Sequence, residues 1–341
     1  MKKHAKKFMI LVATIVIICA ISIVASAETY GDLEYEIVND EVTITGVVEG
    51  VTGDVYIPDA IDGYTVTGIG ESAFMNNWKT ENIYFPDTIK YIGHHFFLGS
   101  KVNFHIKDIK KWCVAEYMNT SGNFESRGGE DFKFFYDGKL IENLVIPYGV
   151  TEIKDCAFWY FGRQLKSVEI PDTVAKIGKF AFLGCDNLES INIPDSVTYI
   201  GEGAFLLASC KGDIIIPDSV KNIDEHAFFT VDLKNIYILN PECILPEYTE
   251  DSSYQGVFNQ YVTIFSHVGF SVEEYVNKND YKFESMHYIN GEWVEANGKE
   301  INNSCEYCKK LLKENPVDYF LLMITDFLNA IMRFLESFSI C

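Results

Sequence analysis

Positively charged residues are scarce in this sequence of 341 residues. Lysine and arginine together number 28, against 49 aspartate and glutamate residues, and the formal net charge is −21. Removing residues 1–27, which contain four lysines and no acid, leaves 24 basic and 49 acidic residues and a net charge of −25. A surface of this charge repels phosphate backbones, which makes nucleic acid a poor partner.

Catalytic motifs are also missing. The sequence contains no G-x-S-x-G nucleophile elbow, no H-E-x-x-H metal motif and no phosphate-binding P-loop. Its seven histidines are scattered, and the Gly-Ile-Gly run at 68–70 belongs to the repeat described below rather than to a nucleotide site. No pair of acids is singled out by spacing. We therefore expect a chain that is not an enzyme and uses no cofactor or catalytic metal.

Residues 1–27 have the pattern of a secretory signal peptide. Lysines precede an apolar stretch, and Ala25, Ser26 and Ala27 supply small residues at the expected cleavage site. The alternative is an uncleaved N-terminal membrane anchor. Both readings predict that the rest of the chain leaves the cytoplasm, and we expect a secreted or extracellular cell-surface location.

One phrase recurs along the chain at a nearly constant spacing. Three copies are IPDTVAKIGKFAF (170–182), IPDSVTYIGEGAF (193–205) and IPDSVKNIDEHAF (216–228). The prolines of successive copies lie 24, 23, 23 and 24 residues apart, at Pro147, Pro171, Pro194, Pro217 and Pro241. This period is typical of leucine-rich repeats, in which each unit buries its apolar face by stacking on its neighbours.

Successive positions of each repeat unit have different structural roles. In the copy at 165–187, the outward Glu169 alternates with inward apolar residues in an extended run. Pro171 ends the strand because it cannot donate to a ladder. Thr173 and the preceding aspartate are expected to form a turn in which their side chains bond local backbone. Gly178 is expected to allow a tight bend.

An Ala-Phe pair closes each unit. Alanine permits close approach and phenylalanine fills the interior, so stacked coils should form a spine of phenylalanine rings. The pairs stand at Ala73-Phe74, Ala157-Phe158, Ala181-Phe182, Ala204-Phe205 and Ala227-Phe228.

The pattern IPxxVxxIGxxAFxxC resembles the BspA-type leucine-rich repeat, which is found in secreted and surface proteins of bacteria and some parasitic protists. Residues 35–74 are similar to the entry module of that family, 104–147 to its mid-array insertion and 262–283 to its closing unit. The resemblance covers about 33–285. It implies a leucine-rich-repeat solenoid, right-handed, with a β-strand ladder and short 3-10 or helical segments. It also implies surface attachment, adhesion or host interaction.

The chain is expected to divide into a signal peptide, a repeat array with terminal caps, a linker and a C-terminal helix. Ser271 followed by Glu274 forms a capping-box pattern, which predicts a short helix over 271–279 in the closing unit. The expected boundaries are 1–27 for the signal peptide, 28–50 for the N-terminal cap, 51–285 for the array, about 99–136 for its insertion, about 262–285 for the C-terminal cap, 286–315 for the linker and 316–341 for the helix.

The cysteines fall into two groups. Cys156, Cys185 and Cys210 follow the repeat and are expected to be packed thiols, because free cysteine behaves as a small buried hydrophobe. Cys305, Cys308 and Cys341 lie beyond the array, and they could form a local or intermolecular disulfide, hold a metal or have no special role. A structural zinc site needs four ligands, and a distant His287 would have to supply the fourth.

The C-terminal segment predicts an amphipathic helix over 316–338. Asn315-Pro316 is a favourable helix start, and most of the polar residues that follow fall on one stripe. Asp326 and Arg333 would lie inside any membrane span, so we expect a helix that does not cross a bilayer. It could dock on the solenoid, associate with another copy or lie on a membrane. The helix is not basic, which favours the first two.

The remaining candidate function is binding. The strands of a solenoid form a ladder whose outward positions make an extended surface. By alternation, the candidate binding residues are Tyr56, Tyr84, Val145, Glu169, Asn192, Ile215 and Tyr237. We expect an exported protein that binds a protein or glycan at a cell surface. The alternative is a structural or self-associating envelope protein without a specific ligand.

Overall fold

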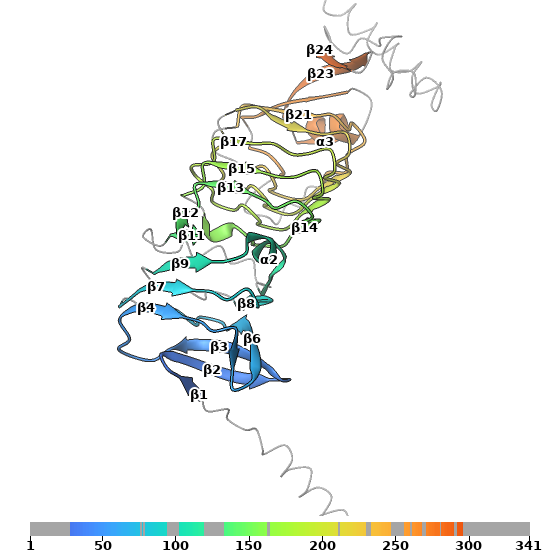
Figure 1. The fold of residues 1–341 in the computed structure, drawn as a ribbon. Coiled ribbons are helices and arrows are strands. Elements are labelled where there is room, and N and C mark those ends of the chain that lie inside the picture. The colour runs from blue at the N-terminus through green and yellow to red at the C-terminus, as the bar shows by residue number, and fades with distance from the viewer. Residues whose placement is uncertain are drawn as a thin grey trace, which may run out of the picture.

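The computed structural model describes residues 28–295, except 76, 78, 94–101, 119–132, 162–163, 211, 230–232, 247–255, 260, 268–270, 280 and 290–291. The described chain is a parallel β-solenoid whose coils stack along one axis (Figure 1). This confirms the fold class that the repeat predicts. The predicted signal peptide, the three C-terminal cysteines and the helix at 316–341 lie outside the described residues.

An antiparallel meander forms the N-terminal end of the stack. It consists of β1 (Glu28–Tyr30), β2 (Leu33–Val38) and β3 (Glu41–Val47). The Tyr35 hydroxyl shares its single proton between two carboxylates, Asp62 at 2.6 Å and Glu28 at 2.9 Å, which ties β1 and β2 to the next turn of the chain. Strand β3 then pairs in parallel with β6 (Tyr64–Ile69), so the meander leads directly into the solenoid.

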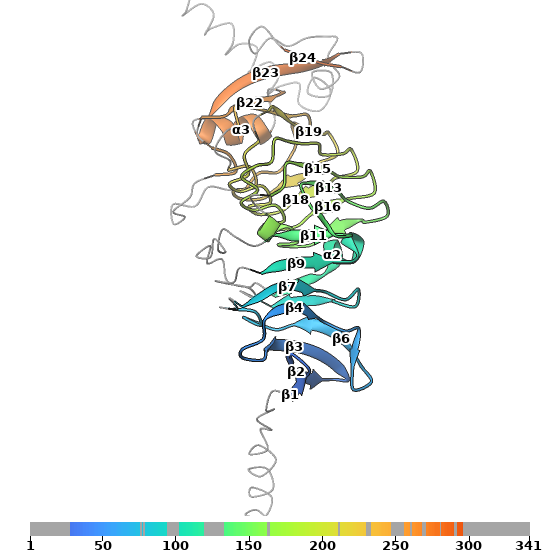
Figure 2. The ribbon, with the colours of Figure 1, turned by 60° about the vertical axis from the view of Figure 1, so that its left-hand side comes forward.

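The strands that precede the proline turns, together with the strands that continue their sheets, form what we call the first ladder (Figure 2). Its pairs are parallel, with two exceptions: β12 folds back antiparallel on β11, and β24 folds back on β23. The strands in order are β4 (Gly53–Tyr56), β7 (Thr80–Tyr84), β9 (Asn103–Ile106), β11 (Phe134–Tyr136), β12 (Lys139–Leu140), β13 (Asn143–Val145), β15 (Ser167–Glu169), β17 (Ser190–Ile191), β19 (Ile214–Ile216), β21 (Asn235–Ile238), β22 (Thr263–Ser266), β23 (Lys282–Ile289) and β24 (Glu292–Glu295). Residues 286–295, expected to begin the linker, therefore belong largely to the β23–β24 hairpin.

The strands that follow the proline turns, together with one strand that continues their sheet, form the second ladder, and little of the described chain is helical. After β6, which also pairs with β5 (Ala60–Ile61), the ladder contains β8 (Tyr91–Gly93), β10 (Glu116–Met118), β14 (Glu152–Ile153), β16 (Lys176–Ile177), β18 (Tyr199–Ile200) and β20 (Asn222–Ile223). The helical segments among the described residues are α2 (Ile109–Val114), the 3-10 turn η1 (Trp159–Phe161) and α3 (Ser271–Lys278). Helix α3 confirms the short helix predicted in the closing unit.

A spine of phenylalanine rings fills the core between the ladders. Phe182 is fully buried and stacks on Phe158 and Phe205 at centroid distances of 5.4 Å each. Phe205 stacks in turn on Phe228 at 5.2 Å, and Phe228 on Phe258 at 6.3 Å. The backbone N–H groups of Phe158, Phe182 and Phe205 donate to the alanine carbonyl of the next coil, as from Phe205 to Ala227 at 2.8 Å. The Phe228 N–H donates instead to the Val257 carbonyl at 3.0 Å. The expected spine is therefore present.

The turn residues Thr173 and Gly178 have structural roles that differ from those predicted from the sequence. The Thr173 hydroxyl donates to the Val150 carbonyl of the preceding coil at 2.9 Å rather than to local backbone. Ser196 and Ser219 make the same contact in their own coils. Gly178 has an ordinary φ, and a Cβ at this position would lie 2.6 Å from the Asp155 amide nitrogen. Contacts with the preceding coil thus determine both residue types. These contacts cannot be inferred from the sequence of a single repeat unit.

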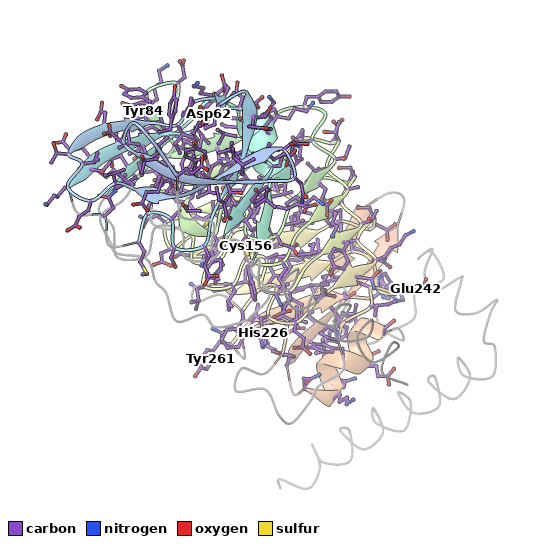
Figure 3. All side chains as sticks on the ribbon, turned by 90° about the horizontal axis from the view of Figure 1, so that it is seen from below. Asp62, Tyr84, Cys156, His226, Glu242 and Tyr261 are labelled. Carbon is purple, nitrogen blue, oxygen red and sulfur yellow. The ribbon has the colours of Figure 1, made fainter. Side chains whose placement is uncertain are left out.

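The left-handed backbone conformation occurs one residue before each Ala-Phe pair. Four of the five positions are occupied by residues other than glycine, which adopt a positive φ at a cost of about 1–2 kcal/mol. The φ values are 56° at Ser72, 60° at Cys156, 55° at Phe180, 57° at Gly203 and 59° at His226. Figure 3 labels Cys156 and His226. The bend predicted at Gly178 therefore falls two residues later.

Replacing Gly178 with alanine should lower the free energy of unfolding by about 1–3 kcal/mol, as overpacking does. The added methyl group would meet backbone of the preceding coil, which cannot move without displacing a hydrogen-bonded ladder. Urea denaturation of the variant measures the effect. Gly212→Ala is the matched control, because no atom lies within 4 Å of its added Cβ. Equal stability of the two variants would contradict the close-approach explanation.

The first ladder is interrupted between β11 and β13, where a glutamine side chain replaces a strand partner. The Oε1 atom of Gln164 accepts from the Phe134 backbone N–H at 2.9 Å. Its Nε2 atom donates to the carbonyl oxygens of Phe134 at 3.0 Å and Ile141 at 2.8 Å. The amide therefore satisfies backbone groups that the β11–β12 hairpin would otherwise leave unpaired.

Candidate ligand-binding face

Strand alternation places one side chain of each first-ladder strand outward in the same register. Val55 and Ile83 point into the core and are almost fully buried, so the next residue on each strand points away from it. The register pairs Tyr56 with Tyr84, Val145 with Glu169, and Ile215 with Tyr237. Six of the seven candidate residues predicted from the sequence thus occupy outward positions of the ladder strands, and Asn192 directly follows β17.

These seven residues differ in exposure. Tyr56, Val145 and Ile215 are 64%, 55% and 58% exposed. Glu169 and Asn192 are also exposed, whereas Tyr84 and Tyr237 are half-buried. The two tyrosines are covered because aromatic neighbours stack on them.

The structure adds three residues that the sequence prediction missed. His105 and Phe135 continue the register from Tyr84, and Phe265 continues it from Tyr237. His105 and Phe135 fall in the segment interpreted as an insertion, and Phe265 falls in the closing unit. The signal was present: buried Phe104 and Phe134 each precede an outward residue.

Four of the outward residues form what we call the aromatic column: Tyr56, Tyr84, His105 and Phe135. Their rings stack nearly parallel, at 4.4 Å from Tyr56 to Tyr84, 4.2 Å from Tyr84 to His105 and 4.8 Å from His105 to Phe135. A second, shorter stack joins Tyr237 to Phe265 at 4.5 Å. Figure 3 shows Tyr84 near the margin of the molecule, viewed from below. Stacking restricts the orientation of these side chains.

A polar network runs beside the aromatic column. Asn82 Nδ2 donates to Asp54 Oδ1 at 2.6 Å. Asn82 Oδ1 accepts from Asn103 Nδ2 at 3.2 Å and from His105 Nε2 at 3.1 Å. The Tyr56 hydroxyl lies 3.5 Å from Asp54 Oδ2. Planar amide and carboxylate groups therefore flank the rings at successive levels of the ladder.

The inner rings of the aromatic column are uncharged at neutral pH. Burial lowers the pKa of the His105 imidazole below 6.5, with Asp54 acting in the opposite direction. Burial also raises the pKa of the Tyr84 hydroxyl above 10, and the nearby Asp54 carboxylate adds to the effect. The two shifts both favour neutral groups, so this surface presents rings and hydrogen-bonding groups rather than cations.

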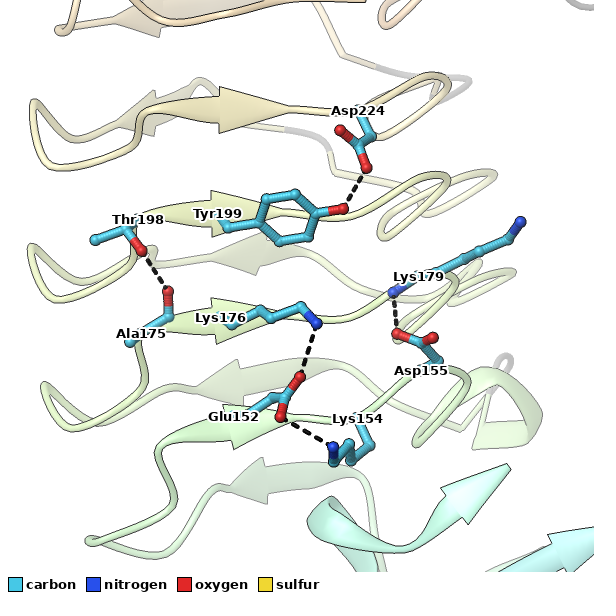
Figure 4. Close-up of polar contacts among 9 residues, drawn as sticks. All are labelled: Glu152, Lys154, Asp155, Ala175, Lys176, Lys179, Thr198, Tyr199 and Asp224. Atoms are coloured by element: carbon cyan, nitrogen blue, oxygen red, sulfur yellow. Dashed lines mark hydrogen bonds and ion pairs between the residues drawn. The ribbon is translucent and has the colours of Figure 1, made fainter. Parts of the chain in front are cut away.

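The second ladder presents a different surface, in which polar groups pair with one another (Figure 4). Lys176 lies 2.8 Å from the Glu152 carboxylate, and its ammonium lies 5.5 Å from the centroid of the Tyr199 ring. Lys154 contacts Glu152 from the other side at 3.1 Å, and the Tyr199 hydroxyl bonds to Asp224. These side chains bind each other, so this face offers less to a ligand than the aromatic column does.

The cysteines of the array are packed thiols, as expected for Cys156, Cys185 and Cys210. All three are buried and free, as are Cys113 and Cys243. Burial raises the pKa of Cys156 and Cys210 to about 12, and it raises that of Cys185 as well. Because the thiolate is the reactive form, these residues serve packing rather than chemistry.

The metal and tail predictions concern residues that the structure describes only in part. Within the described ranges, no group of three or more histidine, cysteine or acidic residues could hold a metal ion. His287 is buried in β23, with its ring 5.6 Å from that of His267. No helix among the described residues is long and apolar enough to cross a membrane.

Comparison with solved structures finds bacterial leucine-rich-repeat proteins. A leucine-rich-repeat protein from Bacteroides ovatus is 20% identical over 70% of each chain, with a TM-score of 0.38. A leucine-rich cell-surface protein from Faecalibacterium prausnitzii is 21% identical over 72% of this chain and 73% of that one, with a TM-score of 0.38. The pneumococcal vaccine antigen PcpA is 17% identical over 76% of this chain and 98% of that one, with a TM-score of 0.35.

Comparison with family models identifies the repeat itself. No curated protein matches the chain. The model of the BspA-type leucine-rich-repeat region matches in six copies over residues 61–122 and 131–249, which is more than half of the sequence. The matched residues contain the repeated sequence pattern and most of the spine and of both ladders. The chain therefore belongs to the BspA-type leucine-rich-repeat family.

Proposed function

We propose that this chain is an exported, non-catalytic binding protein that holds a macromolecular partner at a cell surface through the outward side of the first ladder. The observation that carries the proposal is the aromatic column. It places uncharged rings on the outside of one ladder, whereas the corresponding side chains of the second ladder pair with each other. Exposed aromatic surface is costly for a protein without a partner.

The arrangement of the rings suits binding in two ways. Tyrosine offers a large contact area and a hydroxyl at a small cost in conformational entropy. The stacked neighbours hold Tyr84 and His105 in place, so little further freedom is lost when a ligand binds. Export rests on the signal-peptide pattern of residues 1–27. A cell-surface location is consistent with the cell-surface protein of Faecalibacterium prausnitzii among the similar structures.

A structural role for the column is the competing function. Stacked aromatic pairs contribute about 0.5–1.5 kcal/mol each beyond the area they bury, so the column also stabilises successive coils. A scaffold protein would need the rings for stability and would capture only other copies of itself. The two functions differ in what happens to capture when the rings are removed and the protein remains folded.

Replacing Tyr56, Tyr84 and Tyr237 together with serine should weaken capture of a cell-envelope partner at least tenfold, because buried aromatic anchors dominate interface energies. The purified exported chain is immobilised, and its retention of labelled envelope fractions is measured. The matched control is Tyr148→Ser with Tyr261→Ser, because these tyrosines are 77% and 80% exposed and lie outside the column. The control should capture as the parent does.

Folding of the triple variant must be verified by its melting transition. Loss of the ring contacts should lower stability by about 0.5–1.5 kcal/mol for each stacked pair removed, which leaves a cooperative transition. Full capture by a folded triple variant would move the site off the three tyrosines, with the insertion at about 99–136, which contains His105 and Phe135, as the next candidate.

A further inference from the structure

We infer that the partner of the aromatic column is a neutral glycan, and that Tyr56, Asp54 and Asn82 form its main subsite. This inference rests on the proposed function and specifies its ligand. It follows from how the first ring of the column is exposed, which polar groups lie beside it, how narrow the apolar surface is and what charge surrounds it.

Tyr56 is the terminal ring of the stack. Its strand β4 is the last strand of the sheet that runs β12-β11-β9-β7-β4, so Tyr84 covers one face of the ring. Tyr56 nevertheless remains 64% exposed, which leaves its other face accessible. The inner rings of the column present edges, because their faces are occupied by neighbours. The open face of Tyr56 can therefore accept one further flat, apolar group as an additional level of the stack.

The polar groups beside this face can form hydrogen bonds with the hydroxyl groups of a sugar. Asp54 lies two residues before Tyr56 on the same side of β4. Its Oδ1 accepts from Asn82, while the contact of Oδ2 with the Tyr56 hydroxyl is long, at 3.5 Å, and leaves that oxygen free to accept more. A sugar hydroxyl can both donate and accept. A pyranose ring could thus lay its C–H face on Tyr56 and bond through its hydroxyls to Asp54 and Asn82.

The width of the column favours a thin ligand over a protein surface. The column is one residue wide, and Tyr84, His105 and Phe135 are half-buried. A stable protein interface buries about 800 Å² on each partner around a largely apolar centre. Here the Asp54 carboxylate lies beside the rings instead. The four strands that carry the column span about 14 Å at the usual strand spacing. This length suits a linear chain of a few sugar rings lying along the ladder.

The surrounding charge favours a neutral glycan over an anionic one. The chain carries a net charge of −21, and Asp54 lies inside the proposed subsite. A sulfate, phosphate or uronate group placed within hydrogen-bonding distance of this carboxylate would be repelled. In contrast, the hydroxyls of an uncharged sugar meet acceptors and donors that are already held in position by the network.

The test uses envelope fractions that the parent chain captures. One portion is treated with periodate, which cleaves the vicinal diols of sugars, and another with protease. We expect periodate to abolish capture and protease to leave it. Oligosaccharides released from the untreated envelope are then separated into neutral and anionic fractions and used as competitors. The neutral fraction should compete. Tyr56→Ala and Asp54→Ala should each weaken its binding at least tenfold, with Tyr148→Ala within twofold of the parent.

The possible results separate this inference from the proposed function. Capture that protease removes and periodate spares would overturn the glycan inference while leaving a protein-binding function. Competition by the anionic fraction alone would contradict the inference that the ligand is neutral. Unchanged binding by a folded Tyr56→Ala variant would contradict the assignment of the subsite. If the parent captured no envelope fraction at all, the proposed function itself would be wrong. Asp54→Asn, which keeps the shape and one acceptor, should bind better than Asp54→Ala.

Discussion

Replacing Phe205 with alanine should lower the free energy of unfolding by about 3–5 kcal/mol, the usual cost of truncating a buried phenylalanine. Phe205 is fully buried and lies between Phe182 and Phe228, whose rings stack on its two faces at 5.4 and 5.2 Å. The coils above and below are held apart by backbone hydrogen bonds, so they cannot collapse to fill the space. The cavity term therefore adds to the lost hydrophobic contact.

Equilibrium denaturation in urea, followed by far-UV circular dichroism, measures this loss. The control is Tyr148→Ala, which removes an aromatic ring that is 77% exposed and should change stability by less than about 0.5 kcal/mol. A Phe205→Ala chain as stable as this control would show that the rings do not form a packed spine.

The second large effect is expected at the break between β11 and β13 in the first ladder. Gln164→Ala should cost about 1–3 kcal/mol for each buried backbone group that loses its partner. The Phe134 N–H loses its acceptor and the Ile141 carbonyl loses its side-chain donor. The Phe134 carbonyl retains its bond from the Ile141 N–H at 3.0 Å, so it does not contribute.

Gln164→Glu is the informative companion variant, because it keeps the length and the acceptor but removes both N–H donors. It should also be destabilised, since a carboxylate would face two carbonyl oxygens. Asn143→Ala serves as the control, because this amide is exposed and accepts only from the neighbouring Ser167 hydroxyl in its ladder. Urea midpoints for Gln164→Ala and Asn143→Ala that coincide would contradict a bridging role for the glutamine.

The sequence predicts those parts of the fold that repeat within one unit. The strand before each proline, the inward Ala-Phe pair and the outward register of Tyr56 and Tyr84 all follow from local alternation and period. The helix α3 follows from Ser271 and Glu274, because a capping pattern is also local.

Contacts between coils are what the sequence pattern does not predict. The hydrogen-bond acceptor of the Thr173 hydroxyl lies on the preceding coil, and so do the atoms that exclude a side chain at Gly178. The bonds from Gln164 cross 23 to 30 residues of chain and have no motif. His105 and Phe135 were missed because their repeats are degenerate, although the alternation around Phe104 and Phe134 was readable.

The measurement that tests the central claim most directly compares two single substitutions of exposed tyrosines. Dissociation constants for one envelope fraction are determined for the parent chain, for Tyr56→Ser and for Tyr148→Ser. These side chains are 64% and 77% exposed, and only Tyr56 belongs to the aromatic column. If the aromatic column is the binding face, Tyr56→Ser should bind at least tenfold more weakly than the parent, and Tyr148→Ser should differ from it by no more than twofold. Equal affinities for all three folded proteins would contradict it.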